Sequence, residues 1–217
     1  NGVNRINVSL DTINPKKYPK ITRFGNIEKV FDGINEALDA DIKIKINTVV
    51  IKDFNENEIE ELINWTSNKK IDLTFIEVMP MEETDISREY QFISLSDTFS
   101  KLDKIYKFSK IDYSTGGPAR FYISDLVSNK IGFISPLTNN FCASCNRVRI
   151  SSTGKLFMCL GQNDFVDFRE IMRKDYSDDY IKEKIKFALN IKPKQHDFMI
   201  GEKINKYMKR HMNVTGG

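Results

Sequence analysis

Cysteine and histidine are scarce in this 217-residue chain, and their scarcity limits the chemistry that it can carry. Only three cysteines and two histidines are present. Pairing three cysteines always leaves one thiol over, which disfavours the disulfide framework of small secreted proteins. Both histidines, His196 and His211, lie far downstream of the cysteines. A closed zinc site with four ligands would therefore need a ligand from a distant part of the fold.

A large charge imbalance and a long apolar run are also lacking. The 33 Lys and Arg residues against 30 Asp and Glu give no overall field of the kind that a nucleic-acid coat or a membrane-surface protein needs. No apolar run approaches the ~18 residues that span a bilayer, and no signal-peptide pattern opens the chain. We therefore expect a reduced, cytoplasmic setting without membrane or nucleic-acid partners. Because Asn1 stands directly before a strand-like segment, we also expect further sequence upstream.

The cysteines that are present form a cluster. Two residues separate Cys142 from Cys145, and Cys159 follows after thirteen more. In an intracellular protein, this close pair more often holds a metal or an iron–sulfur cluster than a structural disulfide. Three thiolates suit a [4Fe–4S] cluster with one iron left open for an outside ligand. The alternatives are a zinc knuckle completed by a distant His or Asp, and three unconnected buried thiols.

Strand and helix patterns alternate over the first 81 residues, which is typical of parallel βαβ units. Asn26 is the expected N-cap of the first helix, and Asn57 caps the second, with Glu60 completing a capping box. Strands are expected at 5–11, 43–47 and 73–78, with helices at 26–40 and from 57 onward.

The first two strands carry polar side chains on one face. Asn7, Ser9, Lys45 and Asn47 alternate with apolar residues. If the apolar residues face the helices, these polar ones converge on the interior of a barrel that holds a polar ligand. The alternative is that some of them reach solvent at strand ends. Three strands cannot close a barrel, so the first strand would have an unpaired edge, which again points to sequence upstream.

Residues 82–217 show a less regular pattern. The expected fold class is α/β, with the C-terminal part of an incomplete parallel (βα) barrel over 1–81 and an α+β iron–sulfur domain over 82–217. A hairpin flanking Gly154 is expected to carry Cys159 back toward Cys142 and Cys145. Helices are expected at 96–106, 165–174, 177–190 and 204–212, and strands at 119–123, 130–134, 148–151 and 155–158.

Two arginines follow the second cysteine. Alternation on a strand would place Arg147 and Arg149 on the same side, where two guanidinium groups make a good receptor for phosphate oxygens. The alternative is a solvated edge that deters sheet stacking. Their position beside the cysteines favours the phosphate interpretation.

Several short motifs in this order resemble the radical S-adenosylmethionine (radical-SAM) GTP cyclases of molybdenum-cofactor biosynthesis, and the resemblance extends from Gly2 to Gly217. The chain lacks the part that matches the family's first third, which carries the Cys-x-x-x-Cys-x-x-Cys motif. The motifs are Val8–Asp11, Lys45–Asn47, Phe75–Pro80, Gly117–Ala119, Gly132–Ser135, Phe141–Arg149, Cys159–Leu160 and the final Gly216–Gly217.

The resemblance implies a lyase that converts GTP to (8S)-3',8-cyclo-7,8-dihydroguanosine 5'-triphosphate in molybdopterin biosynthesis. A radical formed from S-adenosylmethionine at a separate [4Fe–4S] cluster abstracts H3′, and the ribose carbon attacks C8. The implied partners are GTP, the absent N-terminal radical-SAM segment, a downstream pyranopterin synthase and a second copy in a homodimer. Without the radical-generating motif, this chain alone is expected to be inactive.

The resemblance also assigns roles to individual residues. It implies that Cys142, Cys145 and Cys159 hold a second cluster whose open iron binds guanine. Lys45, Arg147, Val148 and Arg149 match GTP-binding positions, Ser9 and Met79 match S-adenosylmethionine contacts, and Gly216 and Gly217 match a tail that enters the active site.

Two positions in this comparison need comment. Thr74 stands where the family often has arginine, so either another residue supplies the charge or phosphate is held more weakly. For the glycine tail, the alternative is a frayed terminus.

Two other functions remain open at the level of sequence. One is a non-catalytic zinc or iron–sulfur module that binds nucleic acid or a protein. The other is a radical-SAM relative that modifies a peptide or another cofactor, which the Arg-x-Arg pattern disfavours.

Overall fold

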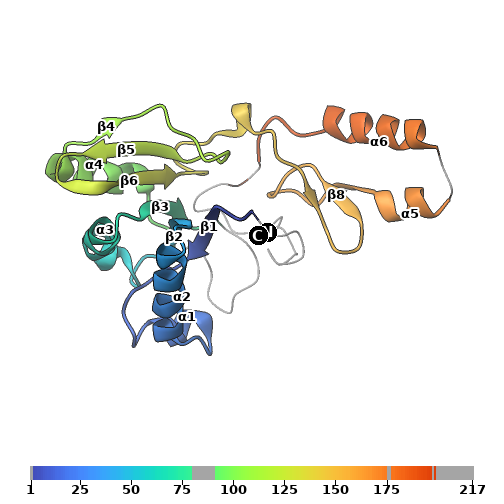
Figure 1. Cartoon of the computed structure of the whole chain (residues 1–217). Helices are drawn as coiled ribbons and strands as arrows, with labels where there is room; N and C mark the ends of the chain where they lie inside the picture. Colours follow the sequence, from blue (N-terminus) through green and yellow to red (C-terminus); the bar gives the residue numbers. More distant parts are fainter. Residues whose placement is uncertain (1, 80–90, 175–176, 197, 199–217) are drawn as a thin grey trace. The chain divides into compact units, whose positions relative to one another are not determined.

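The computed structural model describes residues 2–79, 91–174, 177–196 and 198, which belong to two compact units (Figure 1). The first unit contains the residues up to Val78 together with Gln91–Asn139. The second contains Met79 and the described residues from Asn140 onward. None of the helices in these ranges is long and apolar enough to cross a membrane.

The first unit is built on a sheet with the strand order β1-β2-β3-β6-β5-β4. The first four strands in this order run parallel, and β5 and β4 are antiparallel additions at one side. The expected α/β class and its parallel strands are therefore confirmed, whereas closure into a barrel stays a prediction. The strands are β1 (Arg5–Ser9), β2 (Lys43–Val50), β3 (Asp72–Glu77), β4 (Ser109–Lys110), β5 (Arg120–Ser124) and β6 (Val127–Ile134).

The sheet continues past the domain boundary expected at residue 81. Because β6 pairs with β3, residues 91–139 belong to the first unit. The strands expected at 119–123 and 130–134 are confirmed as β5 and β6, which form an antiparallel hairpin with Asp125 and Leu126 as its connection.

Helix α2 begins where the sequence predicts. The side chain of Asn26 accepts hydrogen bonds from the backbone N–H groups of Glu28 and Lys29, which satisfies the start of the helix. The helices of this unit are α1 (Tyr18–Thr22), α2 (Ile27–Asp39), the 3-10 helix η1 (Glu56–Glu58), α3 (Ile59–Asn68) and α4 (Leu95–Tyr106).

The predicted cap at Asn57 is wrong. Asn57 lies inside η1, and α3 begins after it without a side-chain cap. Asn55 organises this turn instead, because its Oδ1 accepts from the backbone of Ile51 at 2.7 Å and its Nδ2 donates to the carbonyl of Val49 at 2.8 Å. The buried side chain of Asn55 thus fixes the loop, and the α-helix starts at Ile59.

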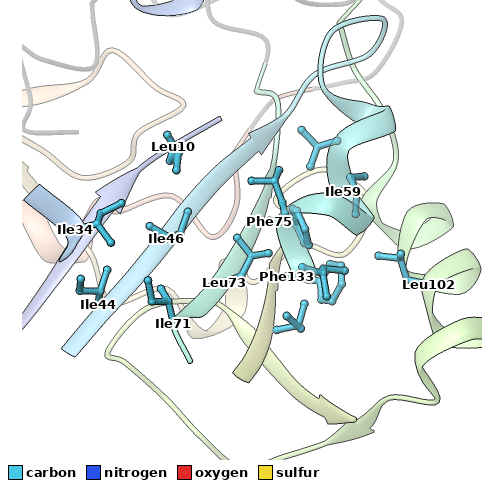
Figure 2. Packing of buried hydrophobic residues seen from close by; sticks show 14 of the residues in the cluster. Leu10, Ile34, Ile44, Ile46, Ile59, Ile71, Leu73, Phe75, Leu102 and Phe133 are labelled. Atoms are coloured by element: carbon cyan, nitrogen blue, oxygen red, sulfur yellow. The ribbon is translucent and has the colours of Figure 1, made fainter. Parts of the chain in front are cut away.

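The core lies between the helices and one face of the sheet (Figure 2). Burying one aliphatic or aromatic side chain of this core contributes about 1.5–3 kcal/mol to the stability of the folded state. Because side chains alternate along a strand, Lys45, Asn47 and Thr74 lie on the opposite face. The core includes Ile34 from α2, Ile59 from α3, Leu102 from α4, and Ile44, Ile46, Leu73, Phe75 and Phe133 from the strands.

The second unit contains a small antiparallel sheet in the order β7-β8-β9. The predicted hairpin is confirmed, but the helix predicted at 165–174 is wrong in its first turn. Val166 pairs with Leu156 of β8, so this segment begins as a strand and becomes helical only after Asp167, whose side chain caps α5. The elements are the 3-10 helix η2 (Cys142–Ser144), β7 (Arg149–Ile150), β8 (Lys155–Phe157), β9 (Phe165–Asp167), α5 (Phe168–Arg173) and α6 (Asp178–Asn190).

Helix α6 confirms the prediction for 177–190, with Ser177 as its N-cap. The helix predicted at 204–212 lies outside the described residues.

Candidate functional site

Cys142 and Cys145 lie at the two ends of one turn. Cys142 opens η2, and the backbone N–H of Cys145 donates to the carbonyl of Cys142 at 3.1 Å. Residues three apart in a 3-10 turn lie on the same side. The chain leaves this turn extended at Cys145, with φ −77° and ψ 108°. The turn therefore presents two thiols together and then directs the chain toward β7.

The β7–β8 hairpin returns the chain to the third cysteine. Its turn is closed by the backbone N–H of Gly154, which donates to the carbonyl of Ser151 at 2.9 Å, and Gly154 has a φ of +79°. That left-handed conformation favours glycine. β8 then leads through the buried Met158 to Cys159.

A lysine that the sequence analysis did not single out joins these two segments. The Lys192 ammonium donates to the carbonyl of Met158 at 2.7 Å and to the carbonyl of Arg147 at 3.0 Å, and lies 3.9 Å from the sulfur of Cys145. The segments that carry Cys145 and Cys159 are therefore held against one another. The sequence offers only a weak signal for this role, since a lysine just after a helix is usually solvated.

None of the three cysteines forms a disulfide, and all three are half-buried. Among the described residues, no three His, Cys, Asp or Glu side chains gather closely enough to hold a single metal ion. A mononuclear zinc site needs its ligands at about 2.0–2.3 Å from one point. The thiols thus lie on linked segments without converging on one point.

Arg147 and Arg149 alternate with exposed apolar residues. Both arginines are half-buried, whereas Val148 and Ile150 are 38% and 65% exposed. Burial lowers the pKa of the Arg149 guanidinium, the charge of Arg147 lowers that pKa further, and Cys145 and Cys159 act in the opposite direction. Arg149 therefore lies within electrostatic reach of the second arginine and of two of the three cysteines.

Val148 and Ile150 line an apolar cavity of about 900 Å³ within the second unit. The opposite wall comes from α5 and α6, through residues such as Met172 and Leu189. Along the short segment 147–150, the arginines thus alternate with the two residues that line the apolar cavity.

In the first unit, the polar face of the sheet carries a row of small polar residues. Ser9, Asn47, Thr74 and Gly132 are register partners on four adjacent parallel strands. The Oδ1 of Asn47 and the Oγ1 of Thr74 are buried without a hydrogen-bond partner in the described part of the chain. Such orphaned oxygens are typical of a face that receives a polar molecule.

Lys45 lies on the same face, two residues before Asn47 on β2. It is 7% exposed, and its ammonium donates to the Oγ1 of Thr115 at 3.3 Å. The carbonyl of Thr115 also accepts from the guanidinium of Arg5 at 3.3 Å. The loop that follows Tyr113 thus lies against this polar face, which sequence reasoning did not anticipate.

Gly132→Ala is expected to destabilise the first unit by about 1–3 kcal/mol. An added Cβ would lie 2.8 Å from the Oγ1 of Thr74 and 2.9 Å from the ring of Phe121. Urea unfolding followed by circular dichroism measures the change. Gly33→Ala is the control, because nothing lies within 4 Å of its added Cβ on the exposed side of α2, and it should stabilise the helix by up to about 1 kcal/mol. Equal stability of the two variants would contradict the expected clash.

The remaining predicted site residues are placed as follows. Met79 lies two residues after the end of β3 and is half-buried, and Ser9 ends β1 and is exposed. Gly216 and Gly217 lie outside the described residues.

Comparison with known proteins gives two family matches. Residues 71–198 match the family described as Molybdenum Cofactor Synthesis C. Residues 1–66 match the Radical SAM superfamily. The two matches meet near the start of β3, so the parallel sheet contains strands from both.

Similar full-length proteins are named GTP 3',8-cyclase. Those of Brucella ovis, Brucella suis and Brucella abortus are each 48% identical over 217 residues, which is all of this chain and 63% of each relative. The chain therefore spans less than two thirds of their length. Since the first family match covers more than half of the chain, the chain belongs to the Molybdenum Cofactor Synthesis C family.

Proposed function

We propose that this chain forms the GTP-binding part of a radical-SAM enzyme that converts GTP to (8S)-3',8-cyclo-7,8-dihydroguanosine 5'-triphosphate. The observation that carries the proposal is the gathering of two arginines with Cys145 and Cys159 in one unit. The relatives named GTP 3',8-cyclase align with the whole chain and supply the reaction class.

The donor set fits an iron–sulfur cluster. Cys142, Cys145 and Cys159 form no disulfide, are half-buried and are carried by one turn and one hairpin. Each cysteine of a four-iron cluster binds a different iron, so the three sulfurs need not share one point. When bound, such a cluster would supply an open iron for the guanine base.

The two arginines suit the triphosphate. Each guanidinium can donate two parallel hydrogen bonds to phosphate oxygens, and these bonds are about twice as strong as neutral ones. The backbone of Val148 and the ammonium of Lys45 are the further GTP contacts in this proposal. Holding the nucleotide at several points would fix the ribose for reaction. This lowers the barrier, because the entropy of orienting the reacting groups is already lost on binding.

The polar face of the first unit suits S-adenosylmethionine. We assign Ser9 and Met79 as contacts of that molecule. Thr74 supplies a buried hydroxyl and no charge, so the proposal leaves the positive charge to Lys45, Arg147 and Arg149.

The proposal has further parts that concern the whole protein. They are a radical-SAM domain that ends near residue 81, a Gly216–Gly217 tail that enters the active site, and a cytoplasmic homodimer. The product would pass to a pyranopterin synthase.

Arg149→Ala is expected to weaken GTP binding by roughly tenfold to a hundredfold, because a lost charge-assisted hydrogen bond costs about 1.5–3 kcal/mol. The measurement is calorimetric titration of GTP into the chain after anaerobic reconstitution with iron and sulfide. Lys186→Ala is the control, since it removes an exposed positive charge of α6 that does not line the cavity and should leave binding unchanged.

The same preparation tests the rest of the proposal. Metal analysis should give about four irons and four sulfides per chain, and GTP should bind without turnover. One zinc per chain, or binding to nucleic acid with a steep salt dependence, would favour the non-catalytic module. Cyclic product from this chain alone would refute the assignment of radical generation to another segment.

A further inference from the structure

Lys192 is fixed in place by the end of α6. It follows Ile191, the C-cap residue of that helix, and its backbone N–H donates to the carbonyl of Leu189 at 3.2 Å. Pro193 follows directly and cannot continue the helix. The backbone of Lys192 is thus held by a 13-residue helix, and its side chain leaves from a defined point.

The ammonium group of Lys192 directs its donors to the cysteine segments. A lysine has three N–H donors, and three acceptors surround this one: the carbonyls of Met158 and Arg147 and the sulfur of Cys145. Met158 immediately precedes Cys159, and Arg147 is two residues after Cys145. No carboxylate among the described residues forms an ion pair with Lys192. Its charge is therefore directed at carbonyl dipoles and at one thiol.

The residues after Lys192 pack beside the third cysteine. An added Cβ at Gly161, two residues after Cys159, would lie 2.8 Å from the ring of Phe198 and 3.1 Å from the Cβ of His196. The segment therefore contacts the cysteine site at both of its ends, through Lys192 and through His196 and Phe198.

We propose that Lys192 is a positioning residue of the three-cysteine site, which clips the Cys145 segment to the Cys159 segment and places a positive charge beside a ligand sulfur. This inference rests on the proposed function, because it assumes that the three thiols hold an iron–sulfur cluster.

Two physical effects follow. First, Lys192 spans two segments that are separated by the β7–β8 hairpin, so it reduces the freedom of the ligands before the cluster assembles. Second, nearby charge and hydrogen bonds to sulfur set the potential of an iron–sulfur cluster. A cation beside Cys145 favours the reduced, more negative state and so raises the reduction potential.

The test compares Lys192→Met, Lys192→Arg and the control Lys194→Met in the 217-residue chain. Methionine keeps an unbranched side chain and removes the charge and the donors. Arginine keeps the charge. Lys194 is exposed and lies two residues along the same segment. Because the chain contains only three cysteines, the cluster signals report on this site alone.

Three readouts are needed. They are the rate of iron loss to a chelator after anaerobic loading, the midpoint potential of the loaded chain, and the thermal unfolding of the metal-free chain. Lys192→Met should lose iron at least about tenfold faster, as removal of an outer partner of a metal ligand typically does, and its potential should become more negative. Lys192→Arg should keep a potential close to that of the unmodified chain, and Lys194→Met should change neither property.

The outcomes separate the two proposals. Unchanged iron retention and unchanged potential in Lys192→Met would overturn the role of Lys192 while leaving the proposed function intact. A drop in unfolding temperature without a change in potential would show a merely structural lysine and would also overturn it. If the unmodified chain takes up one zinc or no iron, the proposed function itself fails.

Discussion

Cys142→Ser is expected to abolish the iron–sulfur cluster and, with it, tight binding of GTP. A serine hydroxyl is a poor ligand for iron, and two remaining cysteines cannot hold three corners of a four-iron cluster. Iron should fall from about four per chain to a small fraction of that value after anaerobic reconstitution. Colorimetric iron and sulfide assays, with the visible absorption of the cluster, measure the loss.

The matched control is Ser144→Ala in the same turn. Ser144 is exposed, and its hydroxyl donates only to the carbonyl of Phe141 at 3.1 Å. This variant keeps all three thiols and should load iron normally. Full iron content in Cys142→Ser would show that Cys142 is not a ligand and would remove the basis of the proposed site.

Glu77→Ala should unfold the first unit more readily than any surface substitution, with a loss of about 3 kcal/mol or more. Glu77 is 1% exposed at the end of β3. Its Oε1 accepts from the backbone of Leu95 at 3.1 Å, and its Oε2 accepts from Leu137 at 2.9 Å and from Thr138 at 3.2 Å. The hydroxyl of Thr138 also donates to it. Removing the carboxylate leaves several buried donors without acceptors.

Urea unfolding of Glu77→Ala and of Glu61→Ala provides the comparison. Glu61 lies on the exposed side of α3, where removing a carboxylate should change stability by less than about 0.5 kcal/mol. Equal unfolding midpoints would show that the segments at Leu95 and at Leu137–Thr138 do not depend on Glu77 for their stability. The expected difference would explain why a carboxylate is buried at the end of β3.

Local patterns predicted most elements of the first unit, because each pattern coincides with a local physical cause. Strand alternation gave β1, β2 and β3, and an Asx cap marked the start of α2. The failures came where distant residues decide the structure. Asn57 looks like a cap, yet the buried amide of Asn55 fixes the turn and also donates to the carbonyl of Asp11, 44 positions away.

The candidate site was partly predictable for the same reason. The cysteine spacing and the Arg-x-Arg alternation are local, and the structure preserves both. Lys192 lies 47 positions from Cys145, and nothing in its own neighbourhood indicates that contact. The partner of Lys45, Thr115, is 70 positions away and was equally hidden. Tertiary packing, not periodicity, brings these groups together.

The orphaned oxygens of Asn47 and Thr74 have a thermodynamic consequence for handling the protein. A buried acceptor that lacks a donor weakens the folded state by about 1–3 kcal/mol, so the first unit is less stable than its apolar core alone would make it. A small molecule that donates to either atom should restore that deficit, and stability then rises with its free concentration. The melting temperature of this chain should thus rise with any bound ligand, those at the sheet included, and a screen of polar compounds by thermal shift would report binding without any need for turnover.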